Sequence, residues 1–383
     1  MKIVSANIFA LNIPFVESFS HNLNKRTFSD SIIIKLNTED GLSGFGEGVA
    51  RPYVTGETVK RSIEYIKKVL FPVIKSIDFP DLDISNKSYK ALSFISNHLP
   101  SNKSPGIIAW NASRTAVELA IIDCLLKKKT KSLNSILPVK SETIIYTGVI
   151  PSGTIENTAK IAKYFKSLDL KYIKIKIGTI DDYGCIAIVR EIMGPLVSIR
   201  LDANCAFNLK KAIKFISSIH EFNIESIEQP IPRGNISELS IIKSNSPIPI
   251  MADESIVTID DAEKLIEFNA CDYFNLRISK CGGIYNTLLI ADIAKKAGIR
   301  IQIGCHVGET AILSAAGRHV AAHLNNLRFV EGSYGKLLLA EDITRDNIQF
   351  GHGGEAPVLI GDGLGINVQE DCLKRYAKEV ITI

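Results

Sequence analysis

The sequence predicts an α/β protein in which a (β/α) barrel follows an α+β layer. After Pro138, eight short β-branched runs alternate with amphipathic stretches of helical period. Alternation of this kind is typical of parallel strands, and eight units indicate a barrel. Before Pro138, strand-like residues come first and two long helical stretches follow. A doubly wound open sheet is the alternative, but no glycine-rich phosphate loop follows the first run.

The first third of the chain is predicted as an α+β domain over residues 1–125. KIVSANIFALNI is apolar with some alternation, and SIIIKLNTEDGLSGFGEG has the pattern of a hairpin that turns at Glu39-Asp40-Gly41. Isoleucine and leucine recur three or four apart from Thr58 to about Ile77, which predicts a helix. A second helix is predicted from about Trp110 to Lys127, where the last turn is basic.

The predicted barrel occupies residues 126–338. Its eight strand candidates, in order, are TIIYTGVI, KYIKIKIG, LVSIRLDAN, IESIEQP, IPIMADES, CDYFNLRIS, IRIQIGCH and LRFVEG. The remaining segment, residues 339–383, is rich in glycine and loop-forming residues. We expect it to return and pack on the N-terminal domain.

Composition excludes several classes of protein. The net charge of +4 is small for 383 residues, so no nucleic-acid partner is expected. No apolar run approaches the roughly 18–20 residues that span a bilayer, and MKIVSANIFALNIPF lacks the pattern of a secretory signal. We therefore expect no membrane partner and a cytoplasmic location. The seven cysteines form no CxxC pair, which favours free thiols in a reducing compartment.

Polar residues stand at the C-terminal ends of the middle strands. KIK ends the second run, DAN the third, EQP the fourth and DES the fifth, and Lys280 follows the sixth. The steps from Asp202 to Glu228, to Asp253 and to Lys280 are 26, 25 and 27 residues. One βα unit has about this length, so each step advances one strand around a barrel. These side chains are therefore expected at one mouth of the barrel, where such enzymes keep their active sites.

The residue types indicate a metal-assisted proton transfer. Three carboxylates from adjacent strands suit Mg²⁺, or Mn²⁺ in its place. Each acid alone could cap the following helix, but three at this spacing favour Asp202, Glu228 and Asp253 as metal ligands. Lys174 and Lys176 alternate in a strand, so both face the barrel interior. Lys280 enters from the other side of the ring, which gives two opposed proton carriers.

These motifs resemble the enolase superfamily, specifically its muconate-lactonizing subgroup. The resemblance rests on KIK at 174–176, DAN at 202–204, EQP at 228–230, DES at 253–255 and KCGG at 280–283. It extends over nearly the whole chain. GLSGFGEG at 41–48 resembles the capping-domain hairpin, AVELAIIDCLLKK at 116–128 the helix before the barrel, and PVLIGDGLGINV at 357–368 the C-terminal return.

The resemblance implies a modified TIM barrel, (β/α)₇β, with an α+β N-terminal capping domain. It implies Mg²⁺ on the three carboxylates, and Lys176 and Lys280 as an acid/base pair on opposite faces of a small-molecule carboxylate. Lys174 would support Lys176 and the developing negative charge, as in the superfamily chemistry of a lysine base with Mg²⁺. It also implies a homo-oligomer.

The subgroup contains epimerases or racemases of acylated amino acids and dipeptides, cycloisomerases, and o-succinylbenzoate synthases. Two opposed lysines favour racemisation or epimerisation of a small amino-acid derivative, since either can protonate its own face. Muconate-type cycloisomerisation and dehydration of the o-succinylbenzoate synthase type are the alternatives. A non-catalytic carboxylate-binding protein is disfavoured, because every residue that the chemistry needs is present.

Substrate specificity is expected from the capping-domain loops around Phe15–Thr27 and Arg51–Glu57. Dipeptide epimerases of the subgroup carry Asp-x-Asp at the eighth strand, whereas this chain has Val330-Glu331-Gly332-Ser333. That departure predicts a substrate other than an ordinary dipeptide. His306 resembles the strand-seven histidine of the mandelate racemase subgroup, although Lys280 replaces that subgroup's strand-six aspartate. The candidate substrate-binding residues are Asn204, Glu254, His306, Glu309 and Glu331; a structural role for His306 and a buried polar network for Glu331 are the alternatives.

Overall fold

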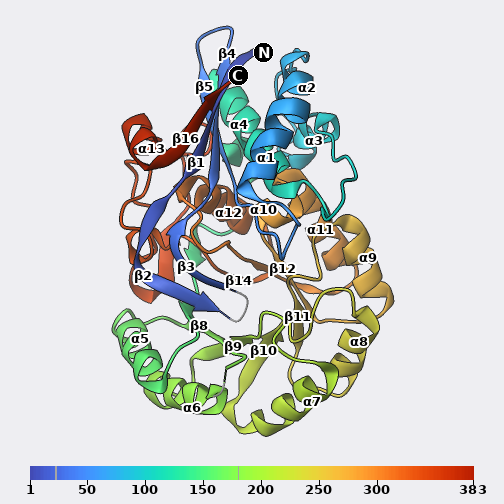
Figure 1. The fold of residues 1–383 in the computed structure, drawn as a ribbon, viewed down its shortest axis with the longest axis vertical. Coiled ribbons are helices and arrows are strands. Elements are labelled where there is room, and N and C mark those ends of the chain that lie inside the picture. The colour runs from blue at the N-terminus through green and yellow to red at the C-terminus, as the bar shows by residue number, and fades with distance from the viewer. Residues whose placement is uncertain (22–23, 180) are drawn as a thin grey trace.

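A four-stranded antiparallel sheet forms one end of the molecule in the computed structural model, which describes residues 1–21, 24–179 and 181–383 (Figure 1). Its order is β16-β1-β4-β5, with bounds Ala377–Thr382, Ile3–Leu11, Ile32–Thr38 and Ser43–Gly48. β4 and β5 pair from Ile32↔Gly48 to Asn37↔Ser43, which confirms the predicted hairpin. Because β16 pairs with β1, the two ends of the chain lie side by side.

A second hairpin, β2 (Ile13–His21) and β3 (Asn24–Ser29), extends from this sheet toward the barrel (Figure 1). The segment Phe15–Thr27, expected as a loop, is thus largely strand; its residues 22–23 lie outside the described part of the chain. The ladder gives this segment a defined backbone next to the barrel mouth.

The helices beside the sheet follow the predicted pattern. α1 (Val59–Tyr65), a π-helical turn (Ile66–Leu70) and α2 (Phe71–Lys75) form the first helical stretch. A 3₁₀ turn (Tyr89–Leu92) and α3 (Ser93–His98), for which no expectation was made, precede α4 (Asn111–Lys128). α4 packs closely on β5, because a Cβ at Gly46 would lie 1.9 Å from the Ala116 carbonyl oxygen. Alternate glycines in β5 therefore allow the helix backbone to reach the strand.

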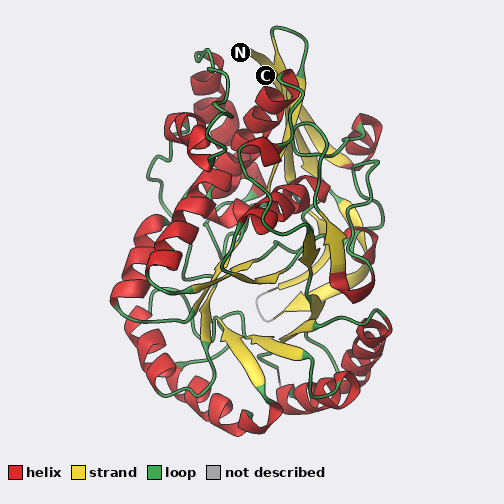
Figure 2. Ribbon diagram, turned by 180° about the vertical axis from the view of Figure 1, so that it is seen from behind, coloured by secondary structure: helices red, strands yellow, loops and turns green. Residues whose placement is uncertain are grey.

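The barrel is an eight-stranded parallel sheet in the order β7 to β14 (Figure 2). A parallel bridge between Tyr146 and Val330 joins its two ends, and the Thr147 N–H donates to the Val330 carbonyl at 2.9 Å. The strands are β7 (Gly148–Ile150), β8 (Tyr172–Lys176), β9 (Ser198–Asp202), β10 (Ile224–Glu228), β11 (Ile250–Ala252), β12 (Tyr273–Leu276), β13 (Arg300–Ile303) and β14 (Leu327–Val330).

Seven βα units and a final strand make up this barrel, which confirms the (β/α)₇β prediction. The helices that surround it are α5 (Ile155–Ser167), α6 (Asp182–Met193), α7 (Leu209–Ser218), α8 (Ile236–Ser244), α9 (Ile259–Glu267), α10 (Ile278–Cys281), α11 (Ile284–Lys296) and α12 (Ala311–His323). Further 3₁₀ turns lie at Leu133–Ser135, His220–Phe222, Gly335–Leu337 and His352–Gly354. The first predicted run is divided: its start forms β6 (Thr143–Ile145), which pairs with β15 (Glu355–Pro357) outside the barrel.

The barrel interior changes character along its axis. Met251, Tyr273 and Phe329 form a small apolar cluster low in the barrel, and charged and amide side chains lie above it. The last helix, α13 (Glu370–Tyr376), leads into β16. The domain boundaries at 125 and 338 stay a prediction.

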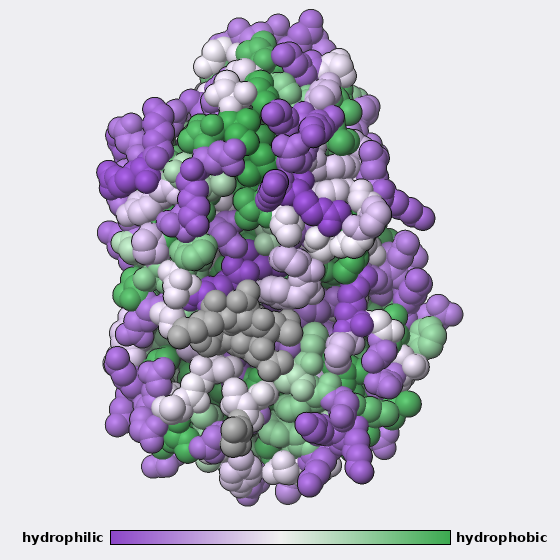
Figure 3. All heavy atoms as spheres, in the orientation of Figure 1, coloured by the Kyte–Doolittle hydropathy of each residue, from purple (hydrophilic) through white to green (hydrophobic). Residues whose placement is uncertain are grey.

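The surface is a mixture of hydrophilic and hydrophobic residues on the face shown in Figure 3. No helix in the described part of the chain is both long and apolar enough to cross a bilayer. All seven cysteines are free thiols.

Candidate active site

Three carboxylates stand at the ends of adjacent barrel strands. Asp202 ends β9, Glu228 ends β10, and Asp253 directly follows β11. The parallel register aligns Asp202 with Glu228 and with Lys176 of β8. All three carboxylates are buried, with at most 1% of each residue exposed. The spacing in the sequence thus corresponds to neighbouring positions at one mouth of the barrel.

Cationic side chains lie between these carboxylates. The Lys174 ammonium is 3.1 Å from both Asp202 Oδ2 and Glu228 Oε2. The Arg277 guanidinium contacts Asp253 and lies 3.6 Å from Glu228 Oε1. Within the described residues, no three His, Cys, Asp or Glu side chains stand together as a ready metal-ligand group. The acids therefore share one neighbourhood but are bridged by cations.

The two lysines predicted to carry protons come from opposite sides of the ring. Lys176 Nζ donates to Asp202 Oδ2 at 2.5 Å and to Asn204 Oδ1 at 2.8 Å. Lys280, on α10 after β12, donates to Asp253 Oδ1 and to the Asp253 and Asn275 carbonyls, each at 2.7 Å. β8 and β12 are four steps apart in a ring of eight strands. The lysines consequently flank the carboxylates from opposite walls.

The electrostatic field differs from one carboxyl to the next. Burial, followed by the charge of Asp202, raises the pKa of Glu228 to about 7. Burial would also raise the pKa of Asp202, but the charges of Lys176 and Lys174 outweigh it and hold that pKa well below its usual value. For Lys174, burial would lower the pKa, but Glu228 and Glu331 outweigh it and keep this lysine cationic.

The chemistry of the donor set fits a hard divalent cation. Beyond the three carboxylates, Glu254 is buried and its Oε2 has no hydrogen-bond partner. Burial and the charges of Asp253 and Asp202 raise the pKa of Glu254 to about 8. A hard divalent cation satisfies a buried carboxylate oxygen that lacks a partner, such as Glu254 Oε2. Asp202, Glu228 and Asp253 are the residues that would hold it.

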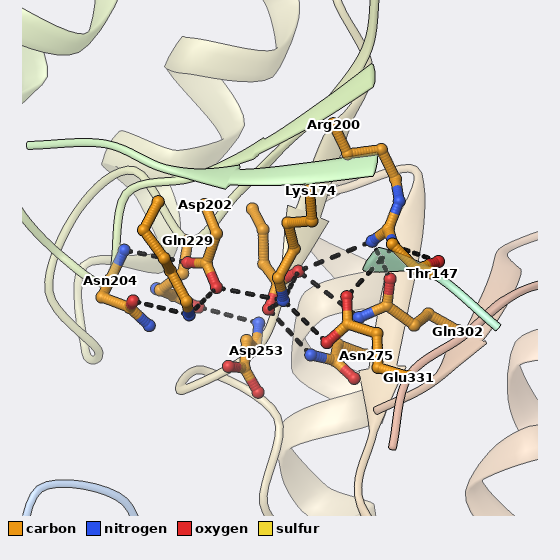
Figure 4. Close-up of polar contacts among 12 residues, drawn as sticks. Thr147, Lys174, Arg200, Asp202, Asn204, Gln229, Asp253, Asn275, Gln302 and Glu331 are labelled. Atoms are coloured by element: carbon orange, nitrogen blue, oxygen red, sulfur yellow. Dashed lines mark hydrogen bonds and ion pairs between the residues drawn. The ribbon is translucent and has the colours of Figure 1, made fainter. Parts of the chain in front are cut away.

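A network of polar side chains surrounds Lys174 (Figure 4). Glu331 accepts from Lys174 Nζ at 2.8 Å and from Arg200 Nη2 at 3.0 Å. Arg200 also bonds Gln302 and Thr147, and Asn275 Nδ2 donates to Glu228 Oε1 at 2.8 Å. Glu331 therefore belongs to a buried polar network, one of the two interpretations that its sequence position allowed.

Sequence reasoning missed the residues Arg200, Asn275, Arg277 and Gln302. The signal was available, because Arg200 lies two residues before Asp202, and alternate residues of a strand share a face. Asn275 lies within β12 and Arg277 directly follows that strand, so these two residues also alternate and share a face. Gln302 is a polar residue between two isoleucines of β13. Polar residues within a barrel strand, and not only at its end, face the site.

A cavity of about 380 Å³ opens beside Lys174, Lys176 and Arg277. Three predicted substrate-binding residues line it: His306, Glu309 and Glu331. The other two, Asn204 and Glu254, are buried among the carboxylates and bond to each other at 3.1 Å. Lys174 and Lys176 thus contact Asp202 and also line the cavity, whereas Lys280 and the three carboxylates are not among the described residues that line it.

His306 and Glu309 form the polar part of the cavity wall. His306 Nε2 is buried and has no hydrogen-bond partner, while burial and the charge of Arg277 hold the His306 pKa well below its usual value. Glu309 Oε1 accepts from Ser314, and burial together with Glu47 raises the Glu309 pKa to about 8. Both side chains are thus neutral near pH 7 and able to meet a polar, uncharged group.

β2 and the segment 335–339, which follows β14, form another part of the cavity wall. Val16, Glu17, Ser18 and Phe19 of β2 line it together with Leu337, Leu338 and Leu339. Arg51, in the second predicted specificity segment, donates to Asp30 at 2.7 Å and to the Val307 carbonyl at 2.8 Å. The first segment thus contacts the cavity directly, whereas Arg51 fixes the loop after β13.

Comparisons with known proteins agree with this architecture. Residues 157–372 match the Enolase C-terminal domain-like family. The chain is 32% identical over 331 residues to a hydrophobic dipeptide epimerase of Enterococcus faecalis, covering 85% of this chain and 89% of that protein. It is 29% identical over 380 residues to the N-succinyl-L-Arg/Lys racemase of Bacillus cereus, covering 98% and 97%.

Solved structures of such proteins have the same fold over the whole chain. The crystal structure of the Bacillus cereus racemase superposes with a TM-score of 0.89 at 28% identity and covers 100% of both chains. A dipeptide epimerase of Cytophaga hutchinsonii, complexed with Mg and the dipeptide D-Ala-L-Val, gives 0.87 at 26% identity, again over 100% of both chains.

Proposed function

The chain belongs to the enolase superfamily, in its muconate-lactonizing subgroup, and is an isomerase; from this premise we propose that Lys176 and Lys280 exchange a proton at the carbon alpha to a substrate carboxylate. The product is the opposite stereoisomer of a small amino-acid derivative. Racemases and epimerases of such compounds are among its relatives.

The observation that carries this proposal is the opposed placement of two buried lysines across one group of carboxylates. β8 and β12 face each other across the ring, and each lysine pairs with a different acid, Asp202 or Asp253. A single base would return the proton to the face from which it came. Two bases on opposite faces allow inversion.

In the proposed reaction the neutral amine of one lysine removes the alpha proton, and the ammonium of the other lysine protonates the opposite face. The C–H bond breaks on one side and forms on the other, so no proton is gained or lost overall. Mg²⁺ held by Asp202, Glu228 and Asp253 would supply the positive charge that stabilises the enediolate. Lys174, which its carboxylate neighbours keep cationic, adds a fixed positive charge nearby.

We propose a substrate whose amino group carries no free positive charge. Glu331, at the position where an ammonium would need an anion, is already paired with Lys174 and Arg200. His306 and Glu309 offer neutral polar contacts instead. An acylated amino acid meets these conditions better than an unmodified dipeptide. A homo-oligomeric state and a cytoplasmic location complete the proposal.

The test follows alpha-proton exchange in D₂O. The panel comprises both enantiomers of N-succinyl-arginine and N-succinyl-lysine, with Ala-Glu and Leu-Tyr dipeptides for comparison. We expect wild-type protein with Mg²⁺ to exchange and invert an N-succinyl compound. Lys176→Ala and Lys280→Ala should each lower the rate of inversion by about a hundredfold or more, because each removes one proton carrier.

Each single variant should retain exchange from one enantiomer only. The enantiomer that still exchanges in Lys176→Ala should be the one that no longer exchanges in Lys280→Ala. If one variant lost exchange from both enantiomers while the other lost none, a single base would be at work, as in cycloisomerisation or elimination. The absence of exchange from every compound of the panel would contradict the proposed proton transfer.

A further inference from the structure

The segment that carries Lys280 is short and makes contacts beyond the barrel. α10 has only four residues and ends at Gly282 (φ +87°) and Gly283 (φ +112°). A single helical turn provides too few internal hydrogen bonds to hold itself in place. Its position must therefore depend on the elements packed against it.

Asn111, the first residue of α4, meets this segment from outside the barrel. Its Nδ2 donates to the Lys280 carbonyl at 2.6 Å and to the Val257 carbonyl at 3.0 Å, and the residue is 3% exposed. Val257 lies in the loop after β11 that begins with Asp253. The Asn111 amide thus joins the segment that carries Lys280 to the loop that carries Asp253, the carboxylate that Lys280 contacts.

The fit around this amide is close. A Cβ at Gly282 would lie 2.7 Å from Asn111 Oδ1. One turn further along α4, Thr115 Oγ1 lies 3.3 Å from the Ile278 carbonyl, at the other end of α10. α4 therefore contacts both ends of the short helix, with the shorter bond at Lys280.

We infer that Asn111 is a positioning residue for Lys280 and not for Lys176, so that it controls proton transfer at one face of the substrate. Its bond goes to the main chain of Lys280 and persists whether the side chain is an ammonium or a neutral amine. The Nζ contacts of Lys280 change with that protonation state. Lys176, in contrast, lies within β8, where the ladder with β9 fixes its backbone.

The consequence is an asymmetry between the two half-reactions. A displacement of about 1 Å in a reacting group costs about a hundredfold in rate. Loss of the Asn111 amide moves the base of the Lys280 side chain and leaves Lys176 in place. Exchange should then slow for the enantiomer that Lys280 deprotonates and remain fast for the other one.

This inference rests on the proposed two-lysine function, and the experiment separates the two. Asn111→Ala is compared with wild type in D₂O, using both enantiomers of the compound that exchanges fastest in the panel above. We expect exchange at the Lys280 face to fall by about tenfold to a hundredfold, with the Lys176 face nearly unchanged. The face of each lysine is assigned from Lys176→Ala and Lys280→Ala.

Ser113→Ala is the matched control. Ser113 also lies in the first turn of α4. Its replacement by alanine removes a comparable buried hydrogen bond, from Ser113 Oγ to Glu57 Oε1 at 2.7 Å, that does not involve α10. Equal slowing at both faces in Asn111→Ala, or the same face-selective loss in Ser113→Ala, would overturn the inference. If Asn111→Ala does not fold, Thr115→Val should show a smaller loss at the same face, and the absence of such a loss would count against it.

Amide hydrogen exchange of residues 277–284 gives a readout that needs no substrate. We expect faster exchange of this segment in Asn111→Ala than in wild type, and no such change in Ser113→Ala. Unchanged protection in Asn111→Ala would refute the positioning role even if the enzyme racemises its substrate. A wild type that exchanges no compound of the panel would refute the proposed function, while the protection of this segment would still decide the role of Asn111.

Discussion

Glu331 shows how one residue links the support of the site to its chemistry. Its two oxygens accept from different cations, Lys174 and Arg200, and all three side chains are buried. Arg200 also lies over the Phe329 ring, 4.1 Å from its centre. The Glu331 carboxylate thus holds Lys174 in place and, through Arg200, connects it to the apolar cluster that contains Phe329.

Replacement of Glu331 by Gln should destabilise the protein strongly. The change leaves two buried cations without their shared anion, and breaking a buried pair in this way costs about 3–5 kcal/mol in the free energy of unfolding. Denaturant unfolding followed by circular dichroism measures the loss. Glu17→Gln is the control, because its pair with Lys160 is 3.8 Å long and about three-quarters exposed on each side, and such pairs contribute about 0–1 kcal/mol. Similar losses in both variants would contradict the role of Glu331.

The limits of sequence reasoning are visible among the same residues. Asp202, Glu228 and Asp253 were predictable because their spacing equals one βα unit, a property that depends only on order along the chain. Lys174 was predictable too, from its alternation with Lys176, but the ion pairs that these side chains form were not. Whether Arg277 contacts Asp253 depends on barrel curvature and side-chain conformation, neither of which a spacing encodes.

At the scale of elements, buried glutamates connect the N-terminal helices and strands to the barrel helices. Glu118 of α4 accepts from the Ile284 N–H, at the start of α11, at 2.6 Å. Glu47 of β5 accepts from the Thr310 and Leu313 N–H groups at the start of α12, at 2.8 and 3.0 Å. Helix starts have unpaired N–H groups and a positive field. Both glutamates lie more than 160 residues from their partners, so capping rules based on neighbouring residues do not find them.

Glu118 should make the stability of the protein depend on pH. Burial is the main cause that raises its pKa from 4.5 to about 7, although the Ile284 N–H and Arg114 oppose the shift. Between these values the folded protein keeps a proton that the unfolded chain releases. Stability therefore falls by about 1.4 kcal/mol per pH unit as the pH rises through this window, and the loss is constant above it.

Glu118→Gln removes the titration and keeps an oxygen that can accept from Ile284. We expect the stability of this variant, relative to wild type, to increase from about pH 4.5 to about 7 and to level off above. Urea unfolding at half-unit steps measures the difference. Two curves that run parallel across this range would show that Glu118 does not titrate in it.

At the scale of the whole molecule, the N-terminal sheet and the barrel place complementary parts around one cavity. The barrel supplies Lys174, Lys176 and Glu331 to the cavity wall, and β2 supplies residues 16–19. The barrel was predictable because the βα alternation is periodic and local. The pairing of β16 with β1 joins residues about 370 positions apart; the residues predicted the return of the C-terminal segment to the N-terminal domain but not the strand with which it pairs.

Metal binding should act on the whole molecule, because its carboxylates join three consecutive strands. A cation bound only by the folded state stabilises it by about 2.7 kcal/mol at a concentration of one hundred times Kd. We expect EDTA to abolish activity and to lower the melting temperature, and Mg²⁺ or Mn²⁺ to restore both. Asp202→Asn should lose the metal-dependent part of the stability, whereas Glu263→Gln, which changes an exposed carboxylate on α9, should retain it. A melting temperature that does not respond to Mg²⁺ in the wild type, or responds equally in Asp202→Asn, would exclude these three carboxylates as the metal site.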